Sequence, residues 1–412
     1  MKIKLILLSL LIPVLTFGAS VNISVNAGKH DRTDCVVTAD VSALKLNEKF
    51  TVELVETTNG GEVATPCQVL LNGKNAELFF VLTGNTGPGQ VRTYVAKKVK
   101  KAKIVETSKM KANMDDKAIV LQKNGKDVLK YNFAINQSPA GVDPIFNRGG
   151  YIHPAYTPSG FVLTNIQPAD HRHHYGIWNP WTKLMYDGQV YDCWNLIERQ
   201  GTVRPEAVEA LYEGDVFSGF DASLNHIVFT DAGERTAMRE IWKVRVYNVG
   251  DGYLWDFESE LTPGSKPVTL KEYRYAGLGF RANAVWTKDN VEMMSSEGKT
   301  RQQIDNTTGR WIYTNGGTGV GNNVAGLLYM CHPDDYNYPE PIRIWNEQQN
   351  MGRGDVYMNF VPTKNMDWKL KANKTYTLKY RFYAYDGMMT PTKAEKIWSD
   401  FGEPPIVKVS KK

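Results

Sequence analysis

Short runs of alternating apolar and polar residues, separated by turn-forming dipeptides, fill most of this chain. Between residues 21 and 105 they include VNISVNA, FTVELVE and AELFFVL, and Asn59-Gly60 and Asn72-Gly73 lie between such runs. A period of two places alternate side chains on opposite faces of a strand, and Asn-Gly supplies the positive φ angles of a tight hairpin. Residues 21–105 are therefore predicted to form a small immunoglobulin-like β-sandwich.

From residue 113 to residue 405 the alternation continues in longer runs that are richer in aromatic residues. A hairpin is predicted to turn at residues 248–252. One helix is predicted, over residues 391–402, with Thr392 as its N-cap. A region of this length is too large for one immunoglobulin domain, so residues 113–405 are predicted to form a large antiparallel β-supersandwich. The expected fold class is all-β.

Charge is nearly balanced along the chain. It has 49 Lys and Arg against 44 Asp and Glu, a formal charge of +5. The excess comes mostly from lysines between residues 97 and 111, which Glu106 alone opposes there. Residues 106–112 are therefore predicted to be a basic linker between the two sandwiches, a solvated segment. Because the rest of the chain is balanced, a broad nucleic-acid surface is excluded.

The first 20 residues read MKIKLILLSLLIPVLTFGAS. A lysine-bearing start, an apolar run and small residues at the end are typical of a secretory signal peptide. The apolar run is shorter than the roughly 20 residues that a membrane-spanning helix needs, and no later segment is long and apolar enough to span a bilayer. We therefore expect a periplasmic or secreted protein without a membrane span.

The chain contains four cysteines: Cys35, Cys67, Cys193 and Cys331. Export would place them in an oxidising compartment. Since Cys35 and Cys67 lie in the same predicted sandwich, they are the expected disulfide pair. None of the four has the spacing of a zinc site.

Histidines cluster between residues 153 and 174, where four of the seven occur. His153 lies in YIHPAYTPSG, and His171, His173 and His174 lie in DHRHHYGIW. Imidazole titrates near neutral pH, which suits it to proton transfer or to metal binding. This cluster is the strongest functional feature of the sequence.

If residues 171–178 form a strand, His174 and Trp178 share one face and Ile177 lies on the other, facing a core. The first face is then the wall of a cleft. Flat aromatic rings beside polar residues are a common way to bind a pyranose, so Trp178 is predicted to stack on a sugar.

A second group of residues occurs in KEYRYAGLGFRA. On a strand, Tyr275, Gly277, Gly279 and Arg281 share one face, and the two glycines would leave a floor free of side chains for a flat ligand. Arg281 suits a carboxylate or a pair of neighbouring hydroxyls. Glu272 or Arg274 is predicted to stand at the rim, and Glu272 is a candidate acid or base.

A third group lies in HPDDYNYPEP, where His332 is the alternative acid or base and Asp334 is a polar contact. His171 and His173 also form an H-x-H pair of the kind that binds metal from one strand. No carboxylate follows at the spacing of a cupin-type site, so neither a metal nor another cofactor is predicted.

Taken in order, YIHPAYTPSG, DHRHHYGIW, GLGFRA and HPDDYNYPEP resemble a family of exported bacterial proteins labelled methane oxygenase PmoA-like. The resemblance covers about residues 113–405. It implies a β-sandwich protein that works in polysaccharide breakdown by Bacteroidetes-like bacteria. The large sandwich with histidines on a concave face is also similar to the galactose-mutarotase supersandwich, whose members include epimerases and glycosidase domains.

The sequence thus predicts an exported glycoside hydrolase acting on an oligosaccharide. The alternatives are a non-catalytic carbohydrate-binding protein and, because histidine replaces a carboxylate pair, a sugar lyase or epimerase. A metal-dependent oxygenase comes after these. The predicted catalytic residues are His171, His173, His174, Glu272 and His332. The predicted substrate-binding residues are His153, Arg172, Trp178, Tyr275, Arg281 and Asp334. In one site, a clustered histidine would share a pocket with Arg281 and with Glu272 or His332.

Overall fold

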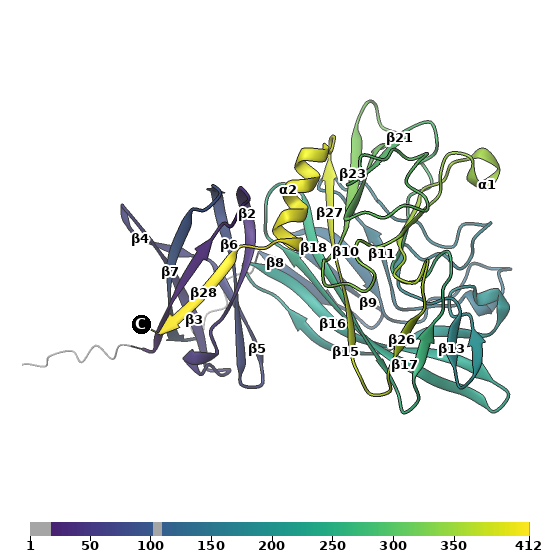
Figure 1. The fold of residues 1–412 in the computed structure, drawn as a ribbon, viewed down its shortest axis with the longest axis horizontal. Helices are drawn as coiled ribbons and strands as arrows, with labels where there is room; N and C mark the ends of the chain where they lie inside the picture. The colour runs from purple at the N-terminus through teal and green to yellow at the C-terminus, as the bar shows by residue number, and fades with distance from the viewer. Residues whose placement is uncertain (1–17, 102–108, 412) are drawn as a thin grey trace, which may run out of the picture.

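The computed structural model describes residues 18–101 and 109–411. Residues 1–17 of the predicted signal peptide and residues 106–108 of the predicted linker lie outside these ranges. The fold is all-β, as predicted, and every pairing between its strands is antiparallel. Figure 1 shows a small sandwich of strands beside a larger one.

The small sandwich consists of a five-stranded and a three-stranded sheet. The first sheet has the order β28 (Ile406–Lys411), β1 (Ser20–Asn26), β7 (Val91–Lys100), β3 (Phe50–Thr58) and β4 (Gly61–Thr65). The second has the order β2 (Arg32–Asp40), β6 (Asn75–Thr86) and β5 (Cys67–Asn72). Val21, Ile23 and Val25 are buried at alternate positions of β1, as a period of two requires. The return of the chain as β28 was not predicted.

The predicted disulfide between Cys35 and Cys67 is wrong, because both cysteines are free. Cys35 on β2 pairs with Leu82 of β6, and Cys67 on β5 pairs with Phe80 on the other side of β6. Neighbouring strands lie about 4.8 Å apart, so β6 keeps the two cysteines about 10 Å apart. A disulfide needs Cα atoms within about 7 Å.

The large sandwich contains two eight-stranded sheets. One has the order β24 (Ile342–Ile344), β25 (Tyr357–Phe360), β20 (Gly279–Arg281), β12 (Ile177–Trp178), β11 (Tyr151–Ala155), β10 (Lys126–Asn132), β9 (Ala118–Lys123) and β8 (Met110–Met114). The other has the order β15 (Gly201–Tyr212), β16 (Phe217–Thr230), β17 (Gly233–Tyr247), β18 (Tyr253–Pro263), β27 (Tyr376–Asp386), β23 (Val324–Cys331), β22 (Trp311–Gly317) and β21 (Val291–Ser295). A smaller sheet has the order β14 (Gln189–Tyr191), β13 (Leu184–Tyr186), β19 (Val268–Leu270) and β26 (Trp368–Leu370).

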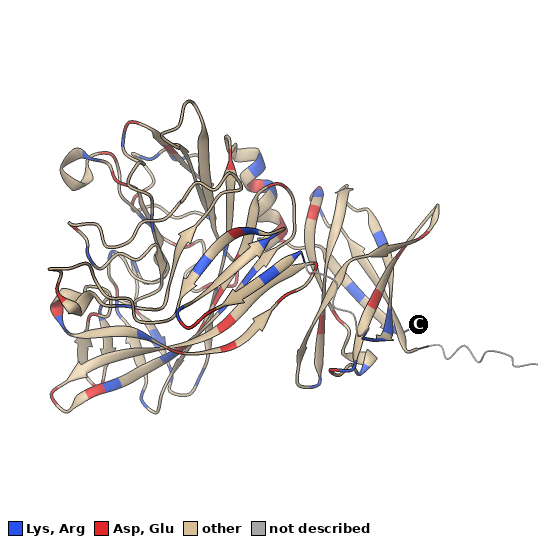
Figure 2. Ribbon diagram, turned by 180° about the vertical axis from the view of Figure 1, so that it is seen from behind, with Lys and Arg blue, Asp and Glu red and all other residues tan. Residues whose placement is uncertain are grey.

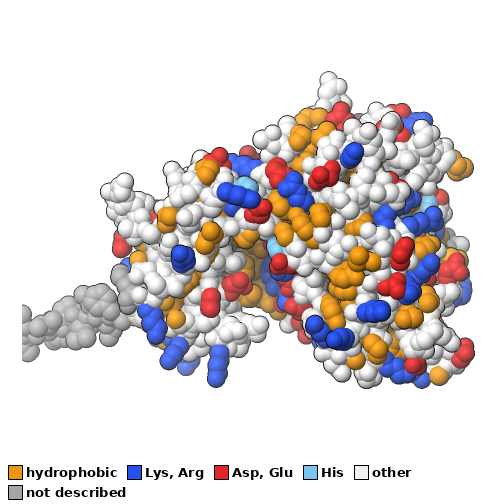
Figure 3. All heavy atoms as spheres, viewed as in Figure 1, with side chains coloured by type: hydrophobic (Ala, Val, Ile, Leu, Met, Phe, Trp, Pro, Cys, Tyr) orange, Lys and Arg blue, Asp and Glu red, His pale blue; other side chains and the backbone are white. Residues whose placement is uncertain are grey.

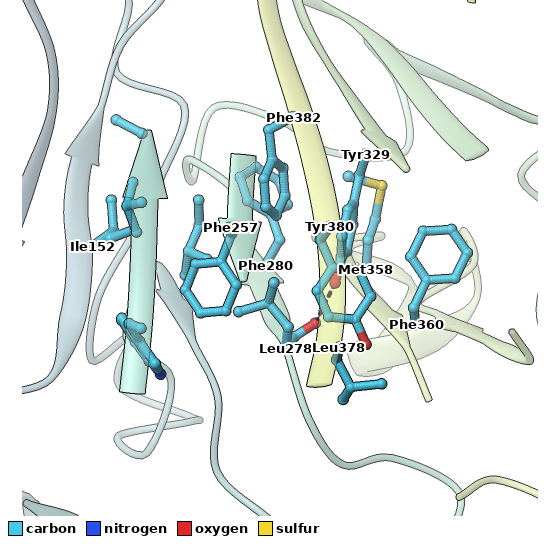
Figure 4. Packing of buried hydrophobic residues seen from close by; sticks show 14 of the residues in the cluster. Ile152, Phe257, Leu278, Phe280, Tyr329, Met358, Phe360, Leu378, Tyr380 and Phe382 are labelled. Carbon is cyan, nitrogen blue, oxygen red and sulfur yellow. Dashed lines mark hydrogen bonds between the residues drawn. The ribbon is translucent and has the colours of Figure 1, made fainter. Parts of the chain in front are cut away.

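The main core lies between the two eight-stranded sheets (Figure 4). Phe280 and Met358 enter it from the sheet that contains β20 and β25. Tyr329 and Phe382 enter it from β23 and β27, and their rings stack with centroids 4.4 Å apart. These four side chains are fully buried, and each such burial is worth about 1.5–3 kcal/mol. The core therefore fixes the position of the strands β12, β20, β24 and β25, whose other face points away from it.

The predicted helix is present as α2 (Pro391–Gly402), and a short second one, α1 (Gln349–Gly352), was not predicted. The N-cap of α2 is Thr390 instead of Thr392. Its hydroxyl accepts a hydrogen bond from the backbone N–H of Lys393 at 3.3 Å, and Pro391 occupies the first helical position, where its missing N–H costs nothing. No helix of the described residues is long and apolar enough to span a bilayer.

The two sandwiches meet at α2 and at a small apolar cluster. Arg32 of the small sandwich is buried, donates to the carbonyl oxygen of Ser399 at 2.8 Å and pairs with Asp400 at 2.9 Å. Phe79 packs edge-on against Phe217 of β16, with centroids 4.9 Å apart. Beside these contacts the surface is hollowed between the two parts (Figure 3). Basic and acidic residues are interspersed over both parts in Figure 2.

Candidate functional site

One cavity of about 360 Å³ gathers the clustered histidines. It lies on the large sandwich, and α1 at its rim lies on the side remote from the small sandwich (Figure 1). The cavity is lined by His171, His173, His174, Trp194, Asn195, Arg274, Tyr275, Arg343, Trp345, Gln349, Asn350 and Tyr357. The sequence placed the first three and Tyr275 in the site.

The cavity lies on the outer face of the sheet whose inner face forms the core. Along β25, Met358 points into the main core and Tyr357 points to an outer aromatic cluster. On β12, Ile177 likewise points into the main core and Trp178 points to the outer aromatic cluster. Alternation along neighbouring strands therefore supplies both the core and the wall of the pocket.

The three histidines come from a turn, so the predicted strand over residues 171–178 is wrong at its start. The backbone N–H of His174 donates to the carbonyl oxygen of His171 at 3.0 Å. The turn brings the ring of His171 to 5.7 Å from that of His173 and to 4.9 Å from that of His174. Gly176 follows with φ of +60°, and a Cβ there would lie 2.3 Å from the carbonyl oxygen of Ile152. Only glycine fits this position.

His174 is the inner wall of the cavity. Its ring stacks on Tyr357 at 5.3 Å and lies 5.0 Å from Trp178 and 5.4 Å from Trp345. Trp178 is fully buried and does not line the cavity, so the prediction that it stacks on a sugar is wrong. It supports His174 from behind.

The predicted glycine floor is also covered by the protein itself. A Cβ on Gly279 would lie 3.0 Å from Trp194 and 3.2 Å from Trp178. Trp181 lies 3.5 Å from the corresponding position on Gly277. The glycines make room for tryptophan rings, and Trp194 in turn lines the cavity.

All three histidines are held neutral at physiological pH. Burial lowers the pKa of His173 to about 4, with further lowering by the charge of His171 and of two arginines. Burial also lowers the pKa of His174 well below its ordinary value. A neutral imidazole carries a free lone pair, so these rings can accept a hydrogen bond from a ligand.

His171 differs from the other two because a carboxylate lies beside it. Its Nδ1 is 3.1 Å from Oδ2 of Asp170, although the angle falls short of a hydrogen bond. Burial lowers the pKa of His171, and Asp170 partly offsets this effect. The side chain is 26% exposed and faces the cavity. A carboxylate beside one ring nitrogen favours the tautomer whose other nitrogen accepts a proton.

Arg281 lies directly behind the aromatic wall. Its guanidinium is 4.7 Å from the ring centre of Trp345, and Nη2 donates to Asp355 at 2.9 Å. The side chain is buried, and its charge lowers the pKa of each of the three histidines. Arg281 therefore acts on the site through the histidines and Trp345.

Glu272 and His332 do not share this pocket, so that part of the prediction is wrong. Glu272 is exposed, and its backbone N–H donates to Asp367 at 2.8 Å. His332 packs against Phe401 of α2, with ring centres 4.9 Å apart. Glu272 follows β19 and His332 follows β23, which lie in other sheets than the one that contains β24 and β25.

Three other predicted contacts also lie outside the cavity lining. His153 has Nδ1 2.8 Å from the hydroxyl of Thr164, and Arg172 donates to the carbonyl oxygen of Gln167 at 2.7 Å. Asp334 is exposed and pairs with Lys379 at 3.2 Å. Each has a local partner, as expected of structural polar groups.

Residues 118–399 match the model of a family of unknown function, DUF6807. The chain belongs to this family. No curated protein matches it, and nothing in the comparisons supports the PmoA-like resemblance.

Among solved structures, this DUF6807 protein is similar to two from Enterococcus faecalis. An α-mannosidase shares 7% identity with it at a TM-score of 0.43, over 95% of this chain and 46% of the mannosidase. A glycosyl hydrolase family 38 protein shares 8% identity at a TM-score of 0.43, over 96% and 48% of the two chains. A galactose mutarotase related enzyme from Lactobacillus acidophilus shares 7% identity at a TM-score of 0.30, over 67% and 97%. The chain spans about half the length of the first two.

Sequence reasoning missed the part of the DUF6807 pocket contributed by β24, β25 and the segment between them. Arg343 and Trp345 alternate with Ile342 and Ile344 in the sequence IRIW, and the isoleucines are buried in the core. A polar and an aromatic residue on the face opposite two core residues is the signal that would have found this wall.

The histidine pocket of this DUF6807 protein has no arrangement typical of a metal centre. Among residues 18–101 and 109–411, no three His, Cys, Asp or Glu side chains are placed to share a metal ion. The polar groups that face the cavity are imidazoles, amides, phenols and two arginines. This set suits hydrogen bonding to a polar organic ligand.

The lowered histidine pKa predicts a specific loss of stability in acid. The unfolded chain binds a proton on His173 below about pH 6.5, whereas the native protein does so only below about pH 4. Between these values the wild type should lose stability relative to the His173→Gln variant, by at most about 1.4 kcal/mol per pH unit. Chemical denaturation of both proteins at a series of pH values measures the difference.

Comparison with the variant is needed because burial raises the pKa of Asp335 and Glu340, which acts in the opposite direction. Both proteins share those carboxyls, so their effect cancels. A difference that stays constant or grows in favour of the wild type between pH 6.5 and pH 4 would contradict the lowered pKa.

Proposed function

We propose that this protein is an exported carbohydrate-active enzyme that binds an oligosaccharide in the histidine pocket. One observation carries the proposal: three neutral imidazoles converge in a cavity whose walls are aromatic rings and whose rim carries amides. Aromatic faces bind the apolar face of a pyranose, and amides such as those of Asn195 and Asn350 bind hydroxyls. Export rests on the character of residues 1–20.

In the proposed reaction His171 is the proton acceptor. It is the only lining histidine with a described carboxylate beside its ring, and its side chain reaches the cavity. Tyr275 and Tyr357 also line the cavity, and burial raises the pKa of both phenols. Because they stay protonated at neutral pH, they are available as hydrogen-bond donors and as a proton source.

The charge state of the nearby carboxyls favours a lyase or an epimerase over a hydrolase. Hydrolysis of glycosides commonly uses two carboxyls, one of them protonated. Burial acts to raise the pKa of Asp170, but polar contacts led by the hydrogen bond from Arg353 outweigh it, and the pKa is lowered. Asp355 is bound by Arg281 at 2.9 Å and by Arg353 at 2.8 Å. Both carboxylates are thus bound by arginines. By contrast, Nδ1 of His171 and Nδ1 of His174 form no hydrogen bond within the described residues.

An oligosaccharide panel read by mass spectrometry tests the proposal. Products whose summed mass equals that of the substrate support a lyase, and an isomer of unchanged mass supports an epimerase. Products that gain one water indicate a hydrolase and overturn the preference for imidazole chemistry. Binding without any product identifies a carbohydrate-binding protein, and neither binding nor turnover across the panel overturns the whole proposal.

A further inference from the structure

The charges that line the histidine pocket are all positive. Arg274 and Arg343 line it, and no Asp or Glu does. Arg274 is exposed, its guanidinium lies 5.5 Å from the ring centre of Tyr275, and it forms no ion pair with the described residues. Surface arginines commonly have acidic neighbours, so an arginine without one at a pocket rim is available to a ligand.

The positive charge continues behind Arg343. Arg343 pairs with Asp305 at 2.6 Å, and Lys364 approaches the same carboxylate at 3.7 Å. Burial lowers the pKa of Lys364 to about 8, helped by the charges of Arg343 and Arg274 and opposed by Asp305. Arg343 and Lys364 therefore share the single carboxylate of Asp305, and Arg274 lies close enough for its charge to act on Lys364, which leaves this side of the pocket positive.

Buried donors in and behind the pocket wall also lack partners. The Oη of Tyr357 is buried and forms no hydrogen bond within the described residues. Behind Trp345, Nε and Nη1 of Arg281 are buried and equally unbonded. A buried donor without a partner costs about 1–3 kcal/mol, and such groups at a binding site are commonly satisfied by the ligand or by water.

We infer that the oligosaccharide carries a carboxylate, as in a uronic acid, and that Arg274 and Arg343 bind it. This inference rests on the proposed function. Two guanidinium groups match a carboxylate in charge and in planar geometry. A carboxylate is favoured over a sulfate or phosphate ester because it also acidifies the C–H bond beside it, which is the bond that a neutral imidazole would need to break.

The corresponding reaction is a β-elimination that needs no co-reactant. His171 takes the proton from the carbon next to the carboxylate, and the electron pair of that C–H bond forms a carbon–carbon double bond. The glycosidic C–O bond on the adjacent carbon breaks, and its electron pair stays on the leaving oxygen. Tyr275 gives that oxygen a proton and is reprotonated from the solvent, and His171 releases its proton. The arginines stabilise the negative charge that develops on the carboxylate.

Binding by calorimetry tests the inference on the full chain. The probes are an oligogalacturonate, the neutral oligogalactoside of the same length and a sulfated form of the latter. We expect the oligogalacturonate to bind at least about tenfold more tightly than the neutral sugar, with affinity falling as salt rises. The Arg274→Gln variant should lose about ten- to a hundredfold in affinity for the uronate and little for the neutral sugar.

Arg235→Gln is the matched control, since Arg235 is an exposed arginine on β17 of the other sheet and has no ion pair with described residues. Arg343→Lys keeps the charge beside Asp305 and should lose less affinity than Arg343→Gln. Equal binding of acidic and neutral sugars, or an Arg274→Gln variant that binds like the wild type, would overturn the inference and leave the proposed function standing. Equal binding of the sulfated sugar would overturn the carboxylate assignment. No binding of any sugar would remove the proposed function itself.

Discussion

Replacing His171 by Asn should reduce turnover of the substrate by at least about a hundredfold, with a much smaller change in KM. Loss of a general acid or base typically costs 10²- to 10⁴-fold. Asn keeps a polar side chain of similar size but has no basic nitrogen, so the proton acceptor is lost while the turn around residues 168–174 is retained. Turnover is measured on the substrate that the panel identifies, and circular dichroism checks the fold.

Two further variants separate the proton-transfer role from a structural one. His153→Gln changes a histidine outside the cavity lining, so it should retain turnover close to that of the wild type. Asp170→Asn should lower turnover less than the loss of His171 and should shift the acid limb of the pH profile downward, because Asp170 raises the pKa of His171. If His171→Asn keeps wild-type turnover, or if His153→Gln is equally impaired, His171 is not the base.

The Trp178→Ala variant should lose about 3–5 kcal/mol of stability, the usual cost of removing a fully buried tryptophan. Trp178 fills the space behind the pocket, with its ring 5.0 Å from His174 and 5.0 Å from Trp194. The cavity left by its removal would also loosen the ring of His174, so turnover should fall together with stability. Urea denaturation measures the free energy of unfolding.

Trp178→Phe is the control, because it keeps an aromatic ring and should lose markedly less stability than the alanine variant. If Trp178 instead stacked on a sugar, its replacement by alanine would weaken sugar binding and leave the stability of the fold nearly unchanged. An alanine variant with wild-type stability but weakened sugar binding would show that Trp178 contacts the substrate and that its buried position is wrong.

Much of the architecture was accessible from local patterns. The period of two in segments such as VNISVNA predicted strands, because the alternation of side chains across a strand depends only on neighbouring residues. The helix was predictable for the same reason, although the sequence placed its N-cap at Thr392 instead of Thr390. Thr390 and Thr392 are both residues that can cap a helix. Pro391 decides in favour of Thr390, because proline is favoured at the first helical position after the N-cap.

The pairing of distant strands was not accessible in this way. β20 lies between β12 and β25, which come from residues about a hundred positions earlier and about eighty later. The order depends on how the whole apolar surface of both sheets is buried, and no local pattern records it. The same limit explains the wrong disulfide, since sharing a sandwich does not place two cysteines on adjacent strands.

By itself, the sequence determined the all-β class, the position of the helix and the segment whose histidines line the pocket. The tertiary structure alone decided the membership of the site: it brought Arg343, Trp345 and Tyr357 to the histidines, buried Trp178 behind them and placed Glu272 and His332 elsewhere. The physical reason is the separation along the chain of the residues that interact. Secondary structure follows from interactions between residues a few positions apart, whereas a pocket on a sheet is made by strands whose adjacency is fixed by burial of the entire core.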